Sequence, residues 1–295
     1  SDAAIIRIHN KDKAIAVSVD SSANYCKSFP LTGGKQIVCE NWRNLISVGA
    51  KPLAITNCLN FGNPENQEIM GEFAECLEGV KEACNFLNYP VVSGNVSFYN
   101  GTNKKNIYPT PVIGGVGLIK KLSKPLSHNF KQADSAIILI GKTFGHIEQS
   151  CYLKENYSIT DGMPPEINLL NEKNNGENIL KLIDKNLILS AHDISNGGLI
   201  TALSEMSLTS DFGAKIHKPK KLTNLFKYFF GEDQARYIIE IQTQKLPIVE
   251  KILKESNIYY ENIGLTQENY FEIEGELKIS TKDLFKINNQ WYSNY

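Results

Sequence analysis

Apolar residues follow strand-like spacing in some parts of the chain and helix-like spacing in others. Residues 4–8 and 14–19 are short apolar runs separated by a polar turn, which predicts two consecutive strands. Between residues 37 and 46, apolar side chains recur at helical spacing, and Gly49 is suited to end that helix. The chain therefore opens with strands and continues into a helix.

A longer helix is predicted where apolar side chains from Ile69 to Leu87 follow one another at steps of three or four. Asn63 is expected to cap this helix and Pro64 to occupy its first position. Another strand begins at 90–92, and we expect it to break at 93–95, where Ser, Gly and Asn form an unusual loop.

Residues 110–119 form a glycine-rich strand, and glycines inside a strand often mark a close approach by another backbone or a ligand. A polar stretch at about 120–134 predicts a domain boundary. We therefore expect an N-terminal domain over residues 1–122 and a C-terminal domain over residues 133–295, the latter opening with a strand at 136–141.

The second domain continues the alternation of strands and helices. Its expected elements are a surface loop at 173–178, which is rich in Asn and Gly, a helix over 199–206, a strand at 238–241 and a helix at 246–256. Strands and helices that alternate throughout predict an α/β or α+β protein in two units.

Composition adds mainly exclusions. The 295 residues include 31 basic and 32 acidic side chains, a balance that argues against binding to nucleic acid or to an anionic membrane surface. No run of about 18 apolar residues occurs, so we expect a soluble chain. Six cysteines without a Cys-x-x-Cys pair indicate free thiols and a reducing compartment, the cytoplasm. The start at Ser1, already close to strand-like sequence, suggests a piece of a longer protein.

Two polar segments of the first domain could carry chemistry. Between a strand and the long helix, residues 57–63 contain three asparagines and a glycine, which suit a phosphate at a helix N-terminus but also an ordinary turn. In the second segment, Gly94 would let a backbone approach a ligand, Asn95 offers a neutral oxygen to Mg²⁺, and Ser97 offers a hydroxyl. A turn with a local hydrogen bond explains this second segment equally well.

The second domain offers two further candidates. Asp193 precedes a glycine-rich helix start, which suits either a metal–phosphate site or a simple helix cap. Glu232 and Arg236 are four residues apart and could simply pair on a helix. The chain has no Walker-type phosphate loop and no Gly-x-Gly-x-x-Gly that follows a strand and opens a helix, so any nucleotide site is of another kind.

Several of these segments together resemble the family of phosphoribosylformylglycinamidine synthases, within the aminoimidazole ribonucleotide synthetase superfamily. The resemblance covers essentially the whole chain, and its most specific part runs from Leu59 to Ser97. The segments that carry it are Val48-Gly49-Ala50-Lys51-Pro52-Leu53, Leu59-Asn60-Phe61-Gly62-Asn63-Pro64-Glu65, Val92-Ser93-Gly94-Asn95-Val96-Ser97, Ile113-Gly114-Gly115-Val116-Gly117, Ala191-His192-Asp193-Ile194-Ser195-Asn196-Gly197-Gly198 and Phe230-Gly231-Glu232.

The resemblance implies a particular architecture and reaction. The family's synthetase has two homologous halves, each with an N-terminal α/β domain and a C-terminal α/β domain, and the N-terminal domains pair through their sheets into a barrel. This chain is similar to the second half only, and the catalytic His-Asn-His-Pro type segment of the first half is absent from it. The family uses ATP to activate the amide oxygen of formylglycinamide ribonucleotide as a phosphate ester, and ammonia then displaces the phosphate.

The resemblance also implies roles for four residues. Asn57 and Gly94 would contact ATP, Asn95 would bind Mg²⁺, and Ser97 would contact the phosphate or ribose of the substrate. Asn57 departs from the family, which often has Asp at this position, and the change removes a charge. No catalytic residue is expected in this chain, because the other wall of the active site belongs to the first half.

By the pseudo-symmetry of the two halves, Asp193 and Glu232 match first-half active-site positions. Here they would face a second, auxiliary nucleotide site together with Asp20. The family commonly has Arg where this chain has Asn24, which weakens the expectation of a phosphate at that site.

The partners that the resemblance implies are the N-terminal half, a glutaminase subunit that supplies ammonia, and a small bridging subunit. An exposed sheet face would seek a partner, so we expect a homodimer of the isolated chain. Two alternatives remain at this point: a module that holds nucleotide without chemistry, and another superfamily enzyme such as a thiamine monophosphate kinase.

Overall fold

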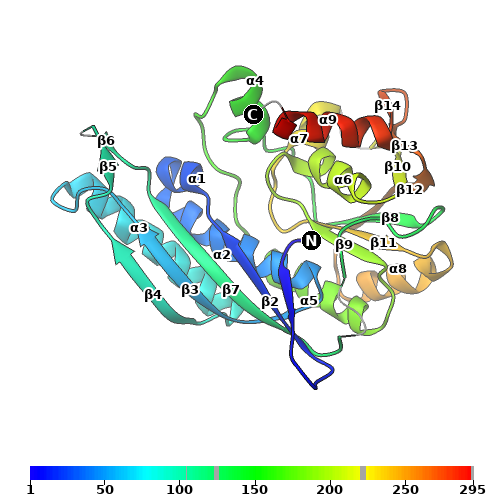
Figure 1. Ribbon diagram of the computed structural model, residues 1–295, viewed down its shortest axis with the longest axis horizontal. Helices are drawn as coiled ribbons and strands as arrows, with labels where there is room; N and C mark the ends of the chain where they lie inside the picture. The colour runs from blue at the N-terminus through cyan, green and yellow to red at the C-terminus, as the bar shows by residue number, and fades with distance from the viewer. Residues whose placement is uncertain (104, 123–125, 220–223, 294–295) are drawn as a thin grey trace.

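The computed structural model of the chain describes residues 1–295 except 104, 123–125, 220–223 and 294–295. Two sheets organise it, one from each end of the sequence, and helices lie between and around them (Figure 1). In the N-terminal part the elements are β1 (Ala4–Arg7), β2 (Ala14–Asp20), α1 (Ala23–Ser28), α2 (Pro30–Ser47), β3 (Lys51–Asn60), α3 (Gln67–Leu87), β4 (Val91–Ser97), β5 (Gly101–Thr102), β6 (Lys105–Asn106) and β7 (Thr110–Ile119).

The first sheet has the order β1-β2-β7-β3-β4, with β3 and β4 parallel and the other neighbours antiparallel. Along β2, Ala14, Ala16 and Ser18 are buried, whereas Ile15 and Val19 are exposed. This alternation shows that α2 and α3 cover one face of the sheet and leave the other face open, as the pleat of a half-buried strand requires.

The C-terminal part forms a seven-stranded sheet in the order β14-β13-β10-β12-β8-β11-β9. Its elements are β8 (Ala136–Ile140), α4 (Cys151–Tyr157), α5 (Leu169–Asp184), β9 (Ser190–Asp193), α6 (Gly198–Leu208), β10 (Phe212–Ile216), α7 (Leu225–Phe230), β11 (Tyr237–Ile241), a 3₁₀ turn (Thr243–Lys245), α8 (Leu246–Glu255), β12 (Tyr260–Glu268), β13 (Tyr270–Ile273), β14 (Leu277–Ser280) and α9 (Thr281–Ser293). The α/β character expected from the sequence is confirmed for both parts.

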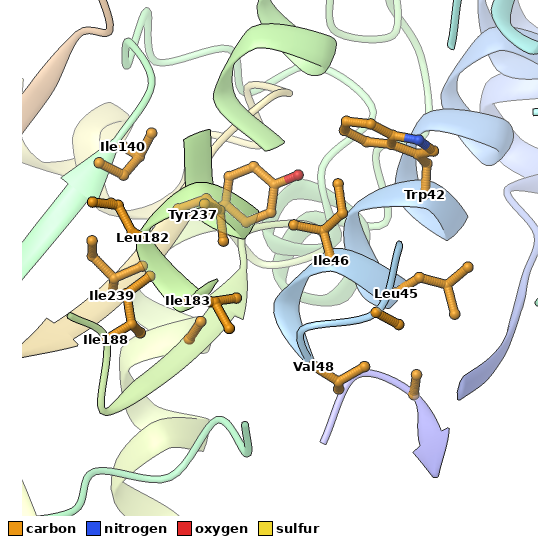
Figure 2. Packing of buried hydrophobic residues seen from close by; sticks show 14 of the residues in the cluster. Trp42, Leu45, Ile46, Val48, Ile140, Leu182, Ile183, Ile188, Tyr237 and Ile239 are labelled. Atoms are coloured by element: carbon orange, nitrogen blue, oxygen red, sulfur yellow. The ribbon is translucent and has the colours of Figure 1, made fainter. Parts of the chain in front are cut away.

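One hydrophobic core joins the two sheets. Trp42 and Ile46 of α2 lie on one side of this core, and Leu182 and Ile183 of α5 lie on the other (Figure 2). Tyr237 of β11 lies between them. All five side chains are at least nine-tenths buried. Because α2 packs on the first sheet with one face and on the second domain with another, the two parts of the chain are held together by apolar burial.

The structure corrects the expected loop at 173–178, which lies inside α5. Asn175 is buried and donates its side-chain amide to the carbonyl oxygen of Ala235 at 2.8 Å. Gly176 faces Trp42, and a Cβ at this glycine would lie 2.3 Å from the Trp42 ring. The Asn- and Gly-rich composition therefore serves close packing between helices rather than a turn.

The start of the long helix also differs from the prediction. Helix α3 begins at Gln67, and its cap is Asn66, whose side chain accepts a hydrogen bond from the Glu68 N–H. The Asn63 side chain instead accepts from the Glu65 N–H and so forms a local turn ahead of the helix.

Within the described residues, no helix combines the length and apolarity that crossing a lipid bilayer requires.

Candidate functional site

Strands β3 and β4 bring two of the expected site residues together. In their parallel register, Asn57 lies opposite Gly94. A Cβ added to Gly94 would lie 1.9 Å from the side-chain oxygen of Asn57, far closer than any real contact. Glycine is therefore required here so that the amide of Asn57 can lie across the edge strand.

The other two expected residues follow on the same strand. Asn95 pairs with Cys58 and Ser97 pairs with Asn60. The residues at 93–95, expected in a loop, belong instead to a regular edge strand, because the parallel ladder to β3 supplies the backbone partners that a turn would otherwise need. All of β4 except Ser97 is exposed, so Asn95 is available to a ligand or a partner chain.

Ser97 is held in place by a short polar network. Its hydroxyl lies 3.2 Å from the side-chain oxygen of Asn100 and 3.1 Å from its nitrogen, and the Asn100 nitrogen also donates to the carbonyl oxygen of Phe61 at 3.0 Å. The adjacent β5–β6 hairpin places Asn106 against Gly62, where a Cβ would lie 2.6 Å from the Asn106 side chain. The loop after β3 and the end of β4 thus form one ordered unit.

The chemistry of this edge is that of neutral oxygen donors. The Asn57 amide lies on the face toward which a Gly94 side chain would point, whereas Asn95 and Ser97 face the other side, because successive residues of a strand alternate. Amide and hydroxyl oxygens suit Mg²⁺, which prefers hard oxygen ligands and shares them with phosphate. The set fits one protein ligand to Mg²⁺ but contains no carboxylate. Further ligands would have to come from ATP, water or a partner chain.

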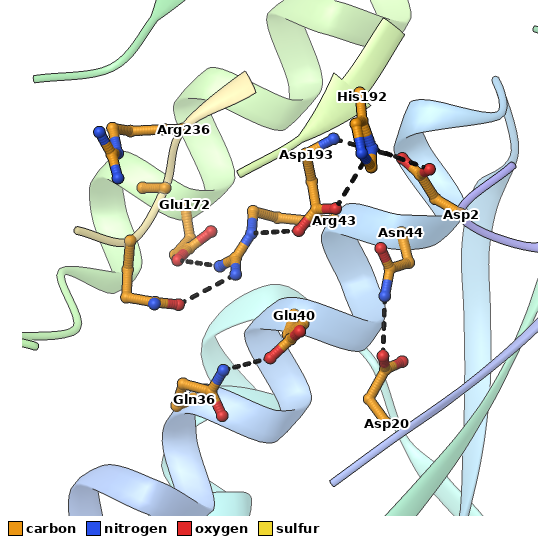
Figure 3. Close-up of polar contacts among 12 residues, drawn as sticks. Asp2, Asp20, Gln36, Glu40, Arg43, Asn44, Glu172, His192, Asp193 and Arg236 are labelled. Carbon is orange, nitrogen blue, oxygen red and sulfur yellow. Dashed lines mark hydrogen bonds and ion pairs between the residues drawn. The ribbon is translucent and has the colours of Figure 1, made fainter. Parts of the chain in front are cut away.

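A second polar cluster lies between the two domains and centres on Arg43 of α2 (Figure 3). Its guanidinium donates to Glu172 at 2.7 Å, to Gln234 at 2.9 Å and to Asp193 at 3.4 Å. The side chains of Arg43 and Glu172 have no exposed surface. Burial lowers the pKa of Arg43, but the surrounding carboxylates more than offset this and raise it, so the arginine stays charged.

Asp193 of β9 shares this cluster. Burial raises the pKa of its carboxyl to about 7, although the positive charge of Arg43 opposes the shift. Asp20 lies at the end of β2, where its carboxylate accepts hydrogen bonds from Asn41 at 2.7 Å and Asn44 at 2.8 Å. Burial raises the pKa of Asp20 as well, and these hydrogen bonds lower it in part.

Glu232 is buried in a different environment. Its carboxylate accepts from the Tyr25 hydroxyl and from the backbone N–H groups of Cys151 and Gly197, each at 2.7 Å. Burial raises its pKa, and these donors oppose the shift. The expected helical pair with Arg236 is not formed: residues 231–236 are not helical, and the Arg236 guanidinium donates to the Gly231 carbonyl oxygen at 2.6 Å.

Asp20, Asp193 and Glu232 thus have established protein partners, and their role at an auxiliary nucleotide site stays a prediction. The sequence pattern indicated Asp193 but neither Arg43, which pairs with it, nor Glu172, which pairs with Arg43. The available signal was a charged residue at position 43 within an apolar helical repeat, which indicates a buried ion pair. The partner on α5, 129 residues away, could not be identified from spacing.

Comparison with known families matches almost the whole chain. Residues 1–119 match the N-terminal domain of AIR synthase related proteins, and residues 132–274 match the C-terminal domain of the same proteins. A curated relative from Pelagibacter ubique, phosphoribosylformylglycinamidine synthase subunit PurL, is 55% identical over 294 residues. The match covers 100% of this chain and 40% of the relative, so the chain spans less than half the length of the curated relatives that it matches.

Solved structures share the fold at low sequence identity. T. maritima PurL complexed with FGAR superimposes with a TM-score of 0.79 at 16% identity, covering 96% of this chain and 47% of that one. The same protein complexed with ATP gives a TM-score of 0.76 at 16% identity, covering 96% and 46% of the two chains. The chain therefore shares the fold of these solved structures.

Proposed function

Because the chain belongs to the family of AIR synthase related proteins, we propose that it forms the second half of an ATP-dependent phosphoribosylformylglycinamidine synthase. The reaction proposed for the whole enzyme converts formylglycinamide ribonucleotide, ATP and glutamine-derived ammonia to the amidine, ADP and phosphate. The catalytic histidine segment would come from the N-terminal half, together with the remaining wall of the active site.

The observation that carries this proposal is the pairing of Asn57 with Gly94 at the open edge of the first sheet. Gly94 leaves room for the Asn57 amide, and this amide at the open edge of the sheet is the group proposed to meet the nucleotide. ATP, when bound, supplies the phosphoryl group that activates the amide oxygen of the substrate. We assign Asn57 and Gly94 to nucleotide contact at this edge.

Asn95 and Ser97 complete the proposed set. Asn95 offers an exposed amide oxygen to Mg²⁺, and Ser97, held by Asn100, offers its hydroxyl to the substrate. Asn57 carries no charge, so this chain contributes polar contacts at this edge and the partner half contributes the carboxylates. The remaining three acidic residues are proposed as part of an auxiliary nucleotide site: Asp20, Asp193 and Glu232.

The open face of the first sheet is the proposed contact with the N-terminal half. It carries exposed apolar side chains on three adjacent strands: Ile6, Ile15, Val19 and Val116. We propose that the sheet of the partner half covers this face to form a barrel, and that the isolated chain forms a homodimer through the same face. A glutaminase subunit and a small bridging subunit would complete the enzyme, and the six free thiols suit the cytoplasm.

A pair of glycine substitutions tests the nucleotide assignment. Gly94→Ala would push the Asn57 side chain away, so we expect the KM for ATP of the reconstituted two-half enzyme to rise at least tenfold. Gly71→Ala in α3 is the matched control, because a Cβ there meets no atom within 4 Å. Equal KM values for ATP in the two variants, with both variants folded and unfolding cooperatively, would contradict the assignment.

A further inference from the structure

Three side chains from distant parts of the sequence converge beside the interdomain cluster. Asp2 precedes β1, His128 lies in the segment between the two sheets, and His192 belongs to β9. One ligand atom from each lies within 4.8 Å of the other two. Asp2 Oδ1 is 2.9 Å from His192 Nδ1 and 3.6 Å from His128 Nδ1.

The Nδ1 atom of each histidine faces Asp2 without forming a hydrogen bond. Nδ1 of His128 and Nδ1 of His192 are both buried, and neither has a hydrogen-bond partner in the described part of the chain. His192 Nδ1 and Asp2 Oδ1 are 2.9 Å apart, an ion-pair contact whose angles fall outside those of a hydrogen bond. The carboxylate oxygen and the two Nδ1 atoms are thus close enough together to bind one ion.

The spacing agrees with a metal ion at such a point. Metal–ligand bonds of about 2.0–2.2 Å place neighbouring ligand atoms about 3.0–3.5 Å apart in octahedral or tetrahedral geometry. The two measured contacts to Asp2, 2.9 Å and 3.6 Å, are close to this range. The rings of His128 and His192 are 5.0 Å apart between centroids and tilted by 33°, so both nitrogens can face the same point.

A second layer of contacts orients the ligands. Nε2 of His192, the nitrogen opposite the convergent one, lies 2.9 Å from a carboxylate oxygen of Glu205 on α6. The other oxygen of Asp2 accepts the backbone N–H of Asp193 at 3.2 Å. A carboxylate behind a ligating histidine fixes its tautomer and increases its basicity, which is the usual support of a metal-bound imidazole.

We propose that Asp2, His128 and His192 bind one divalent transition-metal ion of the zinc type. Two imidazoles and one carboxylate favour such an ion over Mg²⁺ or Ca²⁺, which prefer all-oxygen ligands. Water would complete the coordination, and the His128 side chain keeps 18% of its surface exposed. The ion would tie the segment before β1 and the interdomain segment to the C-terminal sheet.

The site is independent of the nucleotide edge on β3 and β4, so each proposal can fail without the other. The test uses the chain stripped of metal with a chelator and titrated with Zn²⁺ by calorimetry, with Co²⁺ absorption as a spectroscopic readout. We expect one Zn²⁺ per chain, a higher melting temperature with Zn²⁺, and at least tenfold weaker binding in His128→Gln.

His217→Gln is the matched control, since His217 is half-exposed beside Glu274 and lies outside the cluster. It should bind Zn²⁺ like the unaltered chain. Asp2→Asn gives a second test that leaves both imidazoles in place, and it should also weaken binding. Failure of the unaltered chain to bind Zn²⁺ in the micromolar range, or equal affinity in His128→Gln and His217→Gln, would overturn the proposal.

Discussion

The buried arginine between the domains gives the most quantitative prediction. Arg43→Met keeps most of the length of the side chain but removes the charge that Glu172 and Asp193 face. Glu172 has no exposed surface and no room for a hydration shell. The substitution therefore leaves two buried carboxylates without their main counter-charge.

The magnitude follows from this burial. Removing one partner of a buried ion pair costs about 3–5 kcal/mol, because the remaining charge is desolvated and unpaired. Total stabilities are about 5–15 kcal/mol, so Arg43→Met should remove a large share of the free energy of unfolding. Arg7→Met, at an exposed position on β1, should change it by less than about 0.5 kcal/mol.

The loss should also depend on pH. Burial already raises the pKa of Glu172 and Arg43 opposes the shift, so the substitution raises this pKa further. A carboxyl whose pKa is higher in the folded than in the unfolded protein stabilises the fold when it is protonated. This stabilisation is lost as the pH rises through the folded-state pKa. The cost of Arg43→Met should therefore be smaller at pH 5.5 than at pH 8.

Urea unfolding of the unaltered chain, Arg43→Met and Arg7→Met at pH 5.5 and pH 8 measures both the loss of stability and its dependence on pH. Glu172→Gln combined with Arg43→Met should recover part of the stability, because the double variant no longer buries that charge. A cost below about 1 kcal/mol at pH 8, or an equal cost for Arg43→Met and Arg7→Met, would refute the reasoning.

The remaining predictions concern the first sheet and its surroundings. Gly115→Ala should lower the free energy of unfolding by about 1–3 kcal/mol in urea, because its Cβ would lie 1.9 Å from the Asn41 side-chain oxygen. Gly71→Ala should raise it by about 0.5–1 kcal/mol, since the helix loses a flexible residue and meets no clash; a decrease would contradict this. If the isolated chain forms the proposed homodimer, Val19→Lys should give a monomer in sedimentation velocity, whereas Ile248→Lys on α8 should not, and a dimer in both would contradict the proposed face.

Local patterns predicted most of the elements but not the contacts between distant segments. The repeat from Ile69 to Leu87 is a strong signal because one buried face fixes its spacing. The run at 136–140 is strong because all five residues of the strand are buried and apolar. The error at 173–178 has a tertiary cause: Gly176 makes room for Trp42, and no feature of the local sequence reveals that neighbour. A glycine that looks like a turn residue is here a contact point between helices.

The residues of the candidate site on β3 and β4 could be predicted from the sequence, but their arrangement could not. Gly94 and Asn95 stood out as residues suited to a ligand, and the resemblance attached roles to them. Their placement on an edge strand beside Asn57 depends on a parallel register that only the folded chain shows. The convergence of Asp2 with His192 could not be predicted from the sequence for the same reason, since Asp2 precedes β1 and His192 lies on β9 of the other sheet.

The central claim is that this chain supplies one wall of a divided active site. The most direct measurement is ATP hydrolysis that depends on formylglycinamide ribonucleotide and ammonium, with the chain alone and with the N-terminal half added. We expect no turnover by the chain alone and turnover once the two halves are combined. Robust turnover by the chain alone would contradict the claim, because the catalytic group would then lie within this chain.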